Sequence, residues 1–153
     1  RKFYFMICHA IILARGGSKG IKNKNLVTLN NKPLLAWTIE KAKTCKEVSE
    51  VFVSSDSKKI LECAENYGAK IIKRPKKISN DNSSSEAGWA HAIDHITHNL
   101  KLKPELILAP QPTSPIRSND DFSKAISPFS KKLQCVYLSK KYGNNVFHLS
   151  QKI

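Results

Sequence analysis

The sequence lacks several features that mark common classes of protein. Its four cysteines stand far apart and form no C-x-x-C pair, which argues against zinc ribbons and thioredoxin-like redox chemistry. No stretch approaches 18 uninterrupted apolar residues, so no membrane-spanning helix is predicted. Acidic residues are scarce, with 12 Asp and Glu against 26 Lys and Arg. We therefore expect a cytoplasmic protein with reduced thiols and no membrane partner.

Two common phosphate-binding signatures are also missing. The sequence contains neither G-x-G-x-x-G nor G-x-x-x-x-G-K-[ST], which disfavours dinucleotide oxidoreductases and P-loop NTPases. The net charge of +14 nevertheless attracts anions such as nucleotides, acidic sugars or nucleic acid. No aromatic residues are interleaved with the lysines, so we expect no nucleic-acid partner. A basic nucleic-acid-binding α/β module is kept as an alternative.

The length of 153 residues suits one domain with a real core, and we treat residues 1–153 as that domain. Residues 1–5 are a candidate upstream extension, because Met6 is a candidate start. Strands and helices are predicted to alternate along the chain. The expected strands are 3–14, 50–54, 69–73, 105–109 and 134–139, and the expected helices are 33–44, 57–67, 83–100 and a segment from about 120. This order predicts an α/β fold with three layers, a mostly parallel sheet and helices on both faces.

Local signals mark where the helices begin and end. Ser55 or Asp56 is expected to cap the helix 57–67, and Gly68 to end it in a left-handed conformation. Ser83 and Glu86 have the spacing of a capping box. Pro128 is expected to bend or end the last helix.

Three histidines follow along the predicted helix 83–100. His91, His95 and His98 have a metal-like spacing, but they are expected on the solvent face, opposite Trp89, Ile93, Ile96 and Leu100. We therefore predict no metal ligand among them. The segment 142–152 is expected to be weakly ordered.

The most informative stretch is a glycine loop that follows the first strand. Gly16, Gly17 and Gly20 allow tight turns and consecutive amides that point at one target. Arg15, Lys19, Lys22 and Lys24 add positive charge around the same place. In a parallel sheet, ligands bind beyond the carboxyl ends of the strands. The polar clusters at that edge are 15–25, 54–57, 74–85 and 110–117, so we predict a phosphate-binding site there.

Four segments in register resemble the acylneuraminate cytidylyltransferases, also called CMP-N-acetylneuraminic acid synthetases. They are Leu13-Ala-Arg-Gly-Gly-Ser-Lys-Gly-Ile-x-x-Lys-Asn25, Val53-Ser-Ser-Asp56, Arg74-Pro with Asp81-x-Ser-x-Ser85, and Gln111-Pro-Thr-Ser-Pro-x-Arg117. Related cytidylyltransferases for the sugar Kdo tend to carry an arginine and proline after the first serine. Ser18-Lys-Gly stands here instead, which favours the sialic-acid branch.

The resemblance implies a nucleotide-diphospho-sugar transferase-like, Rossmann-like fold and a reaction. CMP moves from CTP to the anomeric hydroxyl of an acidic nine-carbon sugar, and pyrophosphate leaves. Arg15 and Lys24 are the implied catalytic residues, because they offset the charge on the leaving group. The resemblance places the CTP contacts at Arg15, Ser18, Lys24, Asn25, Arg74, Ser83 and Ser85, with Lys19 as an addition, and the sugar contact at Gln111. Sialic, legionaminic and pseudaminic acids remain open as the sugar.

The resemblance also implies a longer protein than this chain. Family members continue past the position of Ile153. That further part carries acidic metal ligands, an arginine of the site and a dimerisation segment. We therefore expect a C-terminally truncated domain, a homodimer in the full-length form, and Mg²⁺ ligands beyond residue 153. A chain that binds nucleotide without catalysing transfer is the second alternative.

Overall fold

The computed structural model describes residues 6–17, 20–130 and 144–148. Its centre is a five-stranded sheet in the order β5-β4-β1-β6-β7. The strands pair in parallel except for the antiparallel edge strand β7. Their bounds are β1 Cys8–Leu13, β4 Val48–Ser55, β5 Lys70–Lys73, β6 Leu106–Pro110 and β7 Asn144–His148.

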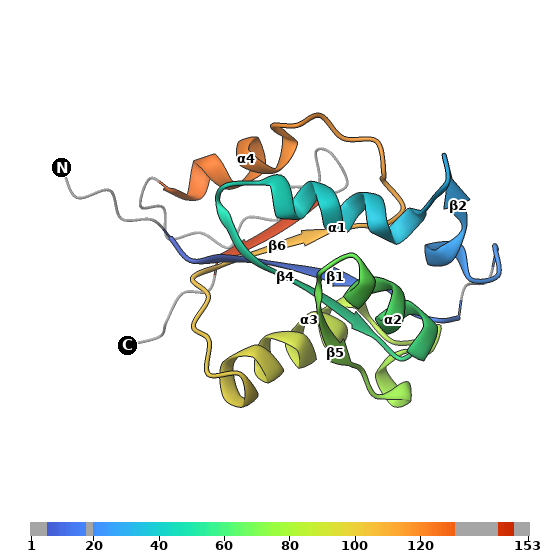
Figure 1. The fold of residues 1–153 in the computed structure, drawn as a ribbon. Helices are drawn as coiled ribbons and strands as arrows, with labels where there is room; N and C mark the ends of the chain where they lie inside the picture. The colour runs from blue at the N-terminus through green and yellow to red at the C-terminus, as the bar shows by residue number, and fades with distance from the viewer. Residues whose placement is uncertain (1–5, 18–19, 131–143, 149–153) are drawn as a thin grey trace.

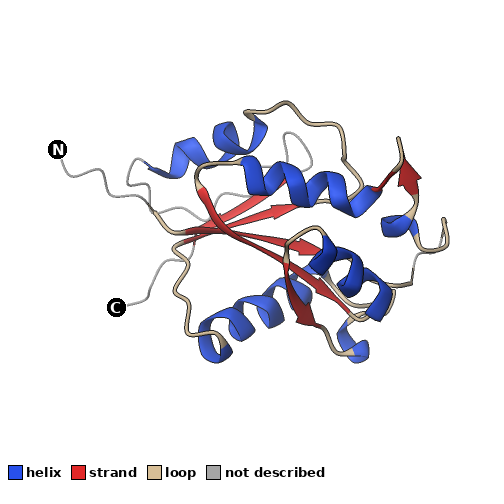
Figure 2. Cartoon of the chain, in the orientation of Figure 1, coloured by secondary structure: helices blue, strands red, loops and turns tan. Residues whose placement is uncertain are grey.

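Helices connect the parallel strands, and a small hairpin stands apart from the main sheet (Figure 2). The α-helices are α1 Leu34–Thr44, α2 Lys58–Asn66, α3 Ser85–Asp94 and α4 Asp121–Ile126. The hairpin pairs β2 Thr28–Leu29 with β3 Lys32–Pro33 across Asn30 and Asn31, whose φ angles are 49° and 60°. The short turns are η1 Lys24–Leu26, η2 Lys76–Ile78, η4 Ser127–Ser130 and the π-helical turn η3 His95–Asn99.

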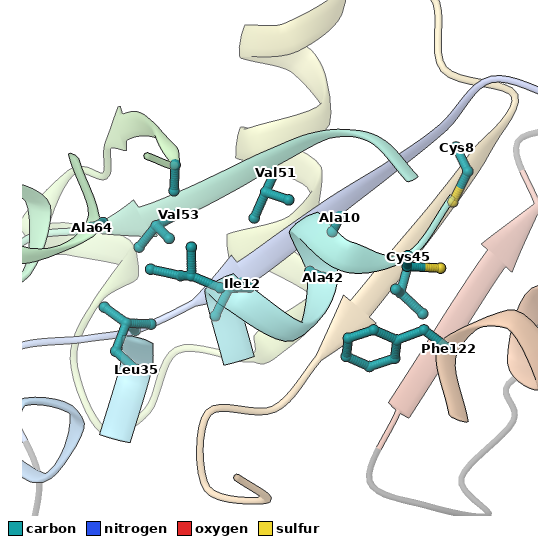
Figure 3. Close-up of a cluster of buried hydrophobic side chains, with 14 of the residues drawn as sticks. Cys8, Ala10, Ile12, Leu35, Ala42, Cys45, Val51, Val53, Ala64 and Phe122 are labelled. Carbon is teal, nitrogen blue, oxygen red and sulfur yellow. The ribbon is translucent and has the colours of Figure 1, made fainter. Parts of the chain in front are cut away.

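The central strand β1 explains the layered core. It is buried from Cys8 to Ile12 because β4 and β6 flank it and helices cover both of its faces. One face packs Ala10 and Ile12 against α1, α2 and α4 (Figure 3). The other face packs Ile11 with Phe52 against α3 and η3.

Figure 1 shows α1 and α4 on one side of the sheet and α3 on the other. The predicted three-layer, mostly parallel α/β fold is therefore confirmed. Gly68 is left-handed as predicted, with a φ of 77°. Pro128 lies where α4 gives way to the 3-10 turn η4, which also agrees with the sequence.

Two predicted helix caps are wrong. Ser84, not Ser83, caps α3, and its side chain accepts a hydrogen bond from the amide of Ala87 at 3.2 Å. The hydroxyl of Ser83 instead donates to Asn80 Oδ1 at 3.0 Å, because the preceding loop folds back on itself. At α2 the N-cap position is Ser57, without a side-chain cap, so Ser55 and Asp56 do not cap this helix.

Three further expectations need correction or lie outside the described residues. Asn144–His148 forms a strand within a segment expected to be weakly ordered, because the edge of β6 offers its backbone a partner. The strand predicted over 134–139 lies outside the described residues. Helix α3 gives way to η3, and Leu100 is exposed rather than buried.

The histidines of this helix also differ from the prediction. His91 is half-buried instead of facing solvent, because the helix packs against the sheet near Arg74. Burial lowers the pKa of His91, and the nearby positive charges add to that effect. Among the residues placed by the structure, no helix is long and apolar enough to cross a membrane.

Candidate functional site

A cleft of about 570 Å³ opens at the carboxyl ends of β1, β5 and β6. This volume is in the range of ligand pockets. The cleft brings together residues that are far apart in sequence but were predicted to bind one substrate pair: Arg15, Lys24, Asn25, Arg74, Ser83, Ser85 and Gln111. Ser18 and Lys19 lie outside the described residues. The structure therefore supports one shared site, while the role of each side chain stays a prediction.

The glycine loop is tied to the end of β4. Gly16 donates its amide to Asp56 Oδ1 at 2.9 Å, and Ala14 donates to the carbonyl of Ser54 at 3.0 Å. A Cβ at position 16 would lie 2.9 Å from the Cβ of Ser57, so glycine is needed for close approach. Gly16 has no positive φ, so its role here is close approach and not a left-handed backbone.

Two more contacts fix the start of this loop. Asn25 is buried, and its side-chain amide donates to the carbonyl of Arg15 at 3.1 Å. Arg15 Nη1 lies 2.7 Å from Asp81 Oδ1, with the two side chains 36% and 42% exposed. An ion pair this exposed is worth at most about 1 kcal/mol, so phosphate oxygens can compete for the guanidinium.

Arg74 reaches the cleft from the opposite wall. Its amide donates to the carbonyl of Ser55 at 2.8 Å, which joins it to the end of β4. The residue is only 6% exposed, and its Nε has no hydrogen-bond partner within the described part of the chain. Burial lowers the pKa of Arg74; the Asp56 carboxylate opposes this and the Arg15 charge adds to it. Such a guanidinium favours a ligand that brings negative charge or a carbonyl oxygen.

The amino-terminal end of α3 closes the cleft beside Arg74. Ser83, Ser84 and Ser85 line it, as does Trp89 one turn further along. The first amides of a helix carry partial positive charge, which adds to the cationic side chains. Gly88 makes room for Arg74, since a Cβ there would lie 2.8 Å from Arg74 Nη1 and 2.9 Å from Leu13 Cδ1. The sequence analysis missed Gly88, because an isolated helical glycine gives no signal of what packs on it.

The third wall is the loop that follows β6. Pro110, Gln111, Pro112 and Thr113 line the cleft. Arg117, at the end of the same segment, does not line it and contacts α1 and α4 instead. The motif suggested a residue at the site edge, whereas the structure places it behind the loop.

The charge of the cleft favours an anion. Of the residues that the structure describes, the titratable ones lining the cleft are Arg15, Lys24, Arg74 and Asp81, three cations to one carboxylate. That carboxylate is already paired with Arg15, and the nearby Asp56 accepts a loop amide. Magnesium prefers several oxygen ligands in octahedral geometry. Within the described part of the chain, no three His, Cys, Asp or Glu residues gather where they could hold a metal ion together.

The chain is similar in sequence to known proteins. A family model described as Cytidylyltransferase matches residues 9–147. An N-acylneuraminate cytidylyltransferase from Escherichia coli is 40% identical over 129 residues, which covers 83% of this chain and 30% of that protein. A Helicobacter pylori protein named pseudaminic acid cytidylyltransferase and UDP-2,4-diacetamido-2,4,6-trideoxy-beta-L-altropyranose hydrolase is 42% identical over 97 residues, covering 63% of this chain and 18% of that protein.

A solved structure shares the fold. The structure of a CMP:2-keto-3-deoxy-manno-octonic acid synthetase complexed with CTP has a TM-score of 0.65 and 21% identity, and covers 80% of this chain and 47% of that one. The predicted nucleotide-diphospho-sugar transferase-like fold is confirmed by this likeness. The chain spans less than half the length of each of these three proteins.

Proposed function

Because this chain belongs to the cytidylyltransferase family, we propose that it carries the nucleotide site of an enzyme that transfers CMP from CTP to an acidic nine-carbon sugar. The observation that carries the proposal is the meeting of Arg15, Lys24 and Arg74 in one cleft opposite Gln111. Cations on three separate segments suit a triphosphate, and a side-chain amide that both donates and accepts suits a polyhydroxyl sugar.

The proposed reaction is a substitution at the α-phosphorus. The anomeric hydroxyl of the sugar attacks that phosphorus, its proton is lost, and the bond to the β-phosphate oxygen breaks to release pyrophosphate. Arg15 and Lys24 offset the charge that develops on the leaving group, and they are held before the reaction begins. Asn25 fixes the backbone of Arg15, and Asp56 fixes the amide of Gly16.

We assign recognition of the nucleotide to the wall of the cleft that Arg74 and the start of α3 form. Arg74 brings a buried positive charge, while Ser83 and Ser85 bring hydroxyl groups that can donate and accept. A polar pocket of this kind rejects the wrong base because its own groups would be left unpaired. Magnesium binding and assembly into a homodimer stay predictions.

Pyrophosphate release tests the proposal. The chain, and a form extended to the length of its relatives, are incubated with CTP, Mg²⁺ and sialic, legionaminic or pseudaminic acid. Release that depends on both CTP and one sugar supports the transfer reaction. Binding of CTP without release from either form supports a nucleotide-binding protein instead. Failure to bind CTP refutes the assignment of the cleft, and tight salt-sensitive binding of single-stranded RNA would favour the basic nucleic-acid module.

A further inference from the structure

Arg117 joins three parts of the fold behind the cleft. Its Nη1 donates to Thr38 Oγ1 at 3.0 Å, and its Nη2 donates to the carbonyl of Gln111 at 2.6 Å. Its Cζ also lies 5.3 Å from the centre of the Phe122 ring. One planar guanidinium therefore bridges α1, α4 and the first residue of the loop after β6.

Both groups that accept a hydrogen bond from Arg117 are held in place by other contacts. Thr38 is fully buried in α1, between the core residues Leu35 and Ile39. The carbonyl of Gln111 also accepts the amide of Ser114 at 3.2 Å, so it is the acceptor of a turn as well. Burial lowers the pKa of Arg117 to about 10, which leaves the group charged at neutral pH. A charged donor of this kind makes a stronger hydrogen bond than a neutral one.

We propose that Arg117 is a positioning residue that holds Gln111 against the cleft and thereby sets the affinity for the acceptor sugar. This inference rests on the proposed function, since it takes Gln111 as the sugar contact. Arg117 acts from behind the loop, through the carbonyl of Gln111 and not through a substrate. The nucleotide side has separate anchors, Asp56 for the glycine loop and Ser55 for Arg74, so its affinity is expected to be independent of Arg117.

Four variants separate positioning from general stability. Arg117→Gln removes the charge and the two-pronged donor, while Arg117→Lys keeps the charge but cannot bridge both acceptors in one plane. Thr38→Val removes one acceptor with little change of volume, and Thr38→Ser keeps that hydroxyl as the matched control. We expect the loss of affinity for the sugar to increase in the order Thr38→Ser, Arg117→Lys, Thr38→Val, Arg117→Gln.

Two measurements are made on the same proteins. The first is the dissociation constant for CMP and for CMP-N-acetylneuraminate, whose ratio isolates the contribution of the sugar. Arg117→Gln is expected to raise the dissociation constant for CMP-N-acetylneuraminate by about tenfold, which is the effect of one lost hydrogen bond. The dissociation constant for CMP is expected to stay within about twofold of the wild-type value. The second is the hydrogen exchange of the Ser114 amide without ligand. It is expected to quicken in Arg117→Gln and Thr38→Val and to stay unchanged in Thr38→Ser.

The outcomes distinguish this inference from the proposed function. Equal weakening of CMP and CMP-N-acetylneuraminate by Arg117→Gln would show a general defect and overturn the positioning role. Unchanged sugar affinity or unchanged Ser114 exchange in Arg117→Gln would overturn it as well. If the wild-type chain binds CMP but gains nothing from the attached sugar, the inference fails while the nucleotide site stands. If it binds neither compound, the proposed function fails and the inference falls with it.

Discussion

Replacing Gly16 by alanine tests the packing that holds the glycine loop against the end of β4. The added Cβ would lie 2.9 Å from the Cβ of Ser57. Carbon atoms prefer a separation of about 3.5–4.0 Å, so the loop or the start of α2 must move by several tenths of an ångström. Such a movement strains the hydrogen bond from the Gly16 amide to Asp56. The clash is with a Cβ, which a change of side-chain rotamer cannot remove.

The expected cost follows from this clash. Overpacking a tight contact costs about 1–3 kcal/mol, which for a chain of this length lowers Tm by roughly 2–12 °C. Gly17→Ala is the matched control, because a Cβ there meets none of the described residues within 4 Å. It is expected to leave stability unchanged or slightly higher, since alanine restricts the unfolded chain.

Thermal and urea unfolding measure both variants alongside the wild type. The CTP dissociation constant, measured on the same samples below the unfolding range, is expected to rise for Gly16→Ala. Equal stability of Gly16→Ala and Gly17→Ala would refute the interpretation that glycine is needed at position 16 for close approach to Ser57. A loss of CTP affinity in Gly17→Ala without any loss of stability would instead show that the ligand uses the open space at Gly17.

Three other changes probe two walls of the cleft and the core. Asp81→Asn removes a carboxylate that competes with phosphate for Arg15, so titration should show CTP binding up to about fivefold tighter; weaker binding would contradict this. Gly88→Ala brings a Cβ within 2.8 Å of Arg74 Nη1 and is expected to weaken CTP about tenfold, while circular dichroism shows α3 intact; unchanged affinity would mean that Arg74 is not a ligand contact. Burial lowers the pKa of His9 below its ordinary 6.5, so the unfolded chain takes up the proton first as the pH falls. The contribution of neutral His9 to the free energy of unfolding is therefore complete above about pH 6.5 and is lost as the pH falls below that value. Urea unfolding should show that the free energy of unfolding of His9→Leu depends less on pH than that of the wild type. An unchanged profile in His9→Leu would assign the slope to another group.

The sequence predicted much of the framework because its signals are local. The expected strand 3–14 contains β1, and the expected helix 33–44 contains α1. The edge at which the site lies followed from the parallel alternation alone. Each of these depends on neighbours in sequence or on a general rule of topology.

The missed features are those that depend on contacts between distant segments. Asp56 looked like a helix cap, but its partner is the amide of Gly16, 40 residues away. Gly88 is explained only by the guanidinium that packs against it, and Arg117 by a hydroxyl on α1. No pattern within one segment contains such partners. The predicted cap of α3 was wrong by a single residue, because Ser83, Ser84 and Ser85 are equally good caps in sequence.

Titration of CTP into the wild-type chain and into Lys24→Ala shows whether the cleft binds the triphosphate of CTP. Trp89 lines the cleft and offers a fluorescence signal, while Trp37→Phe removes the other tryptophan. We expect CTP to bind more tightly than ATP, and Lys24→Ala to raise the CTP dissociation constant at least about tenfold, as the loss of one charged hydrogen bond requires. Equal CTP affinity in the two proteins, or equal affinity for CTP and ATP, would contradict the account.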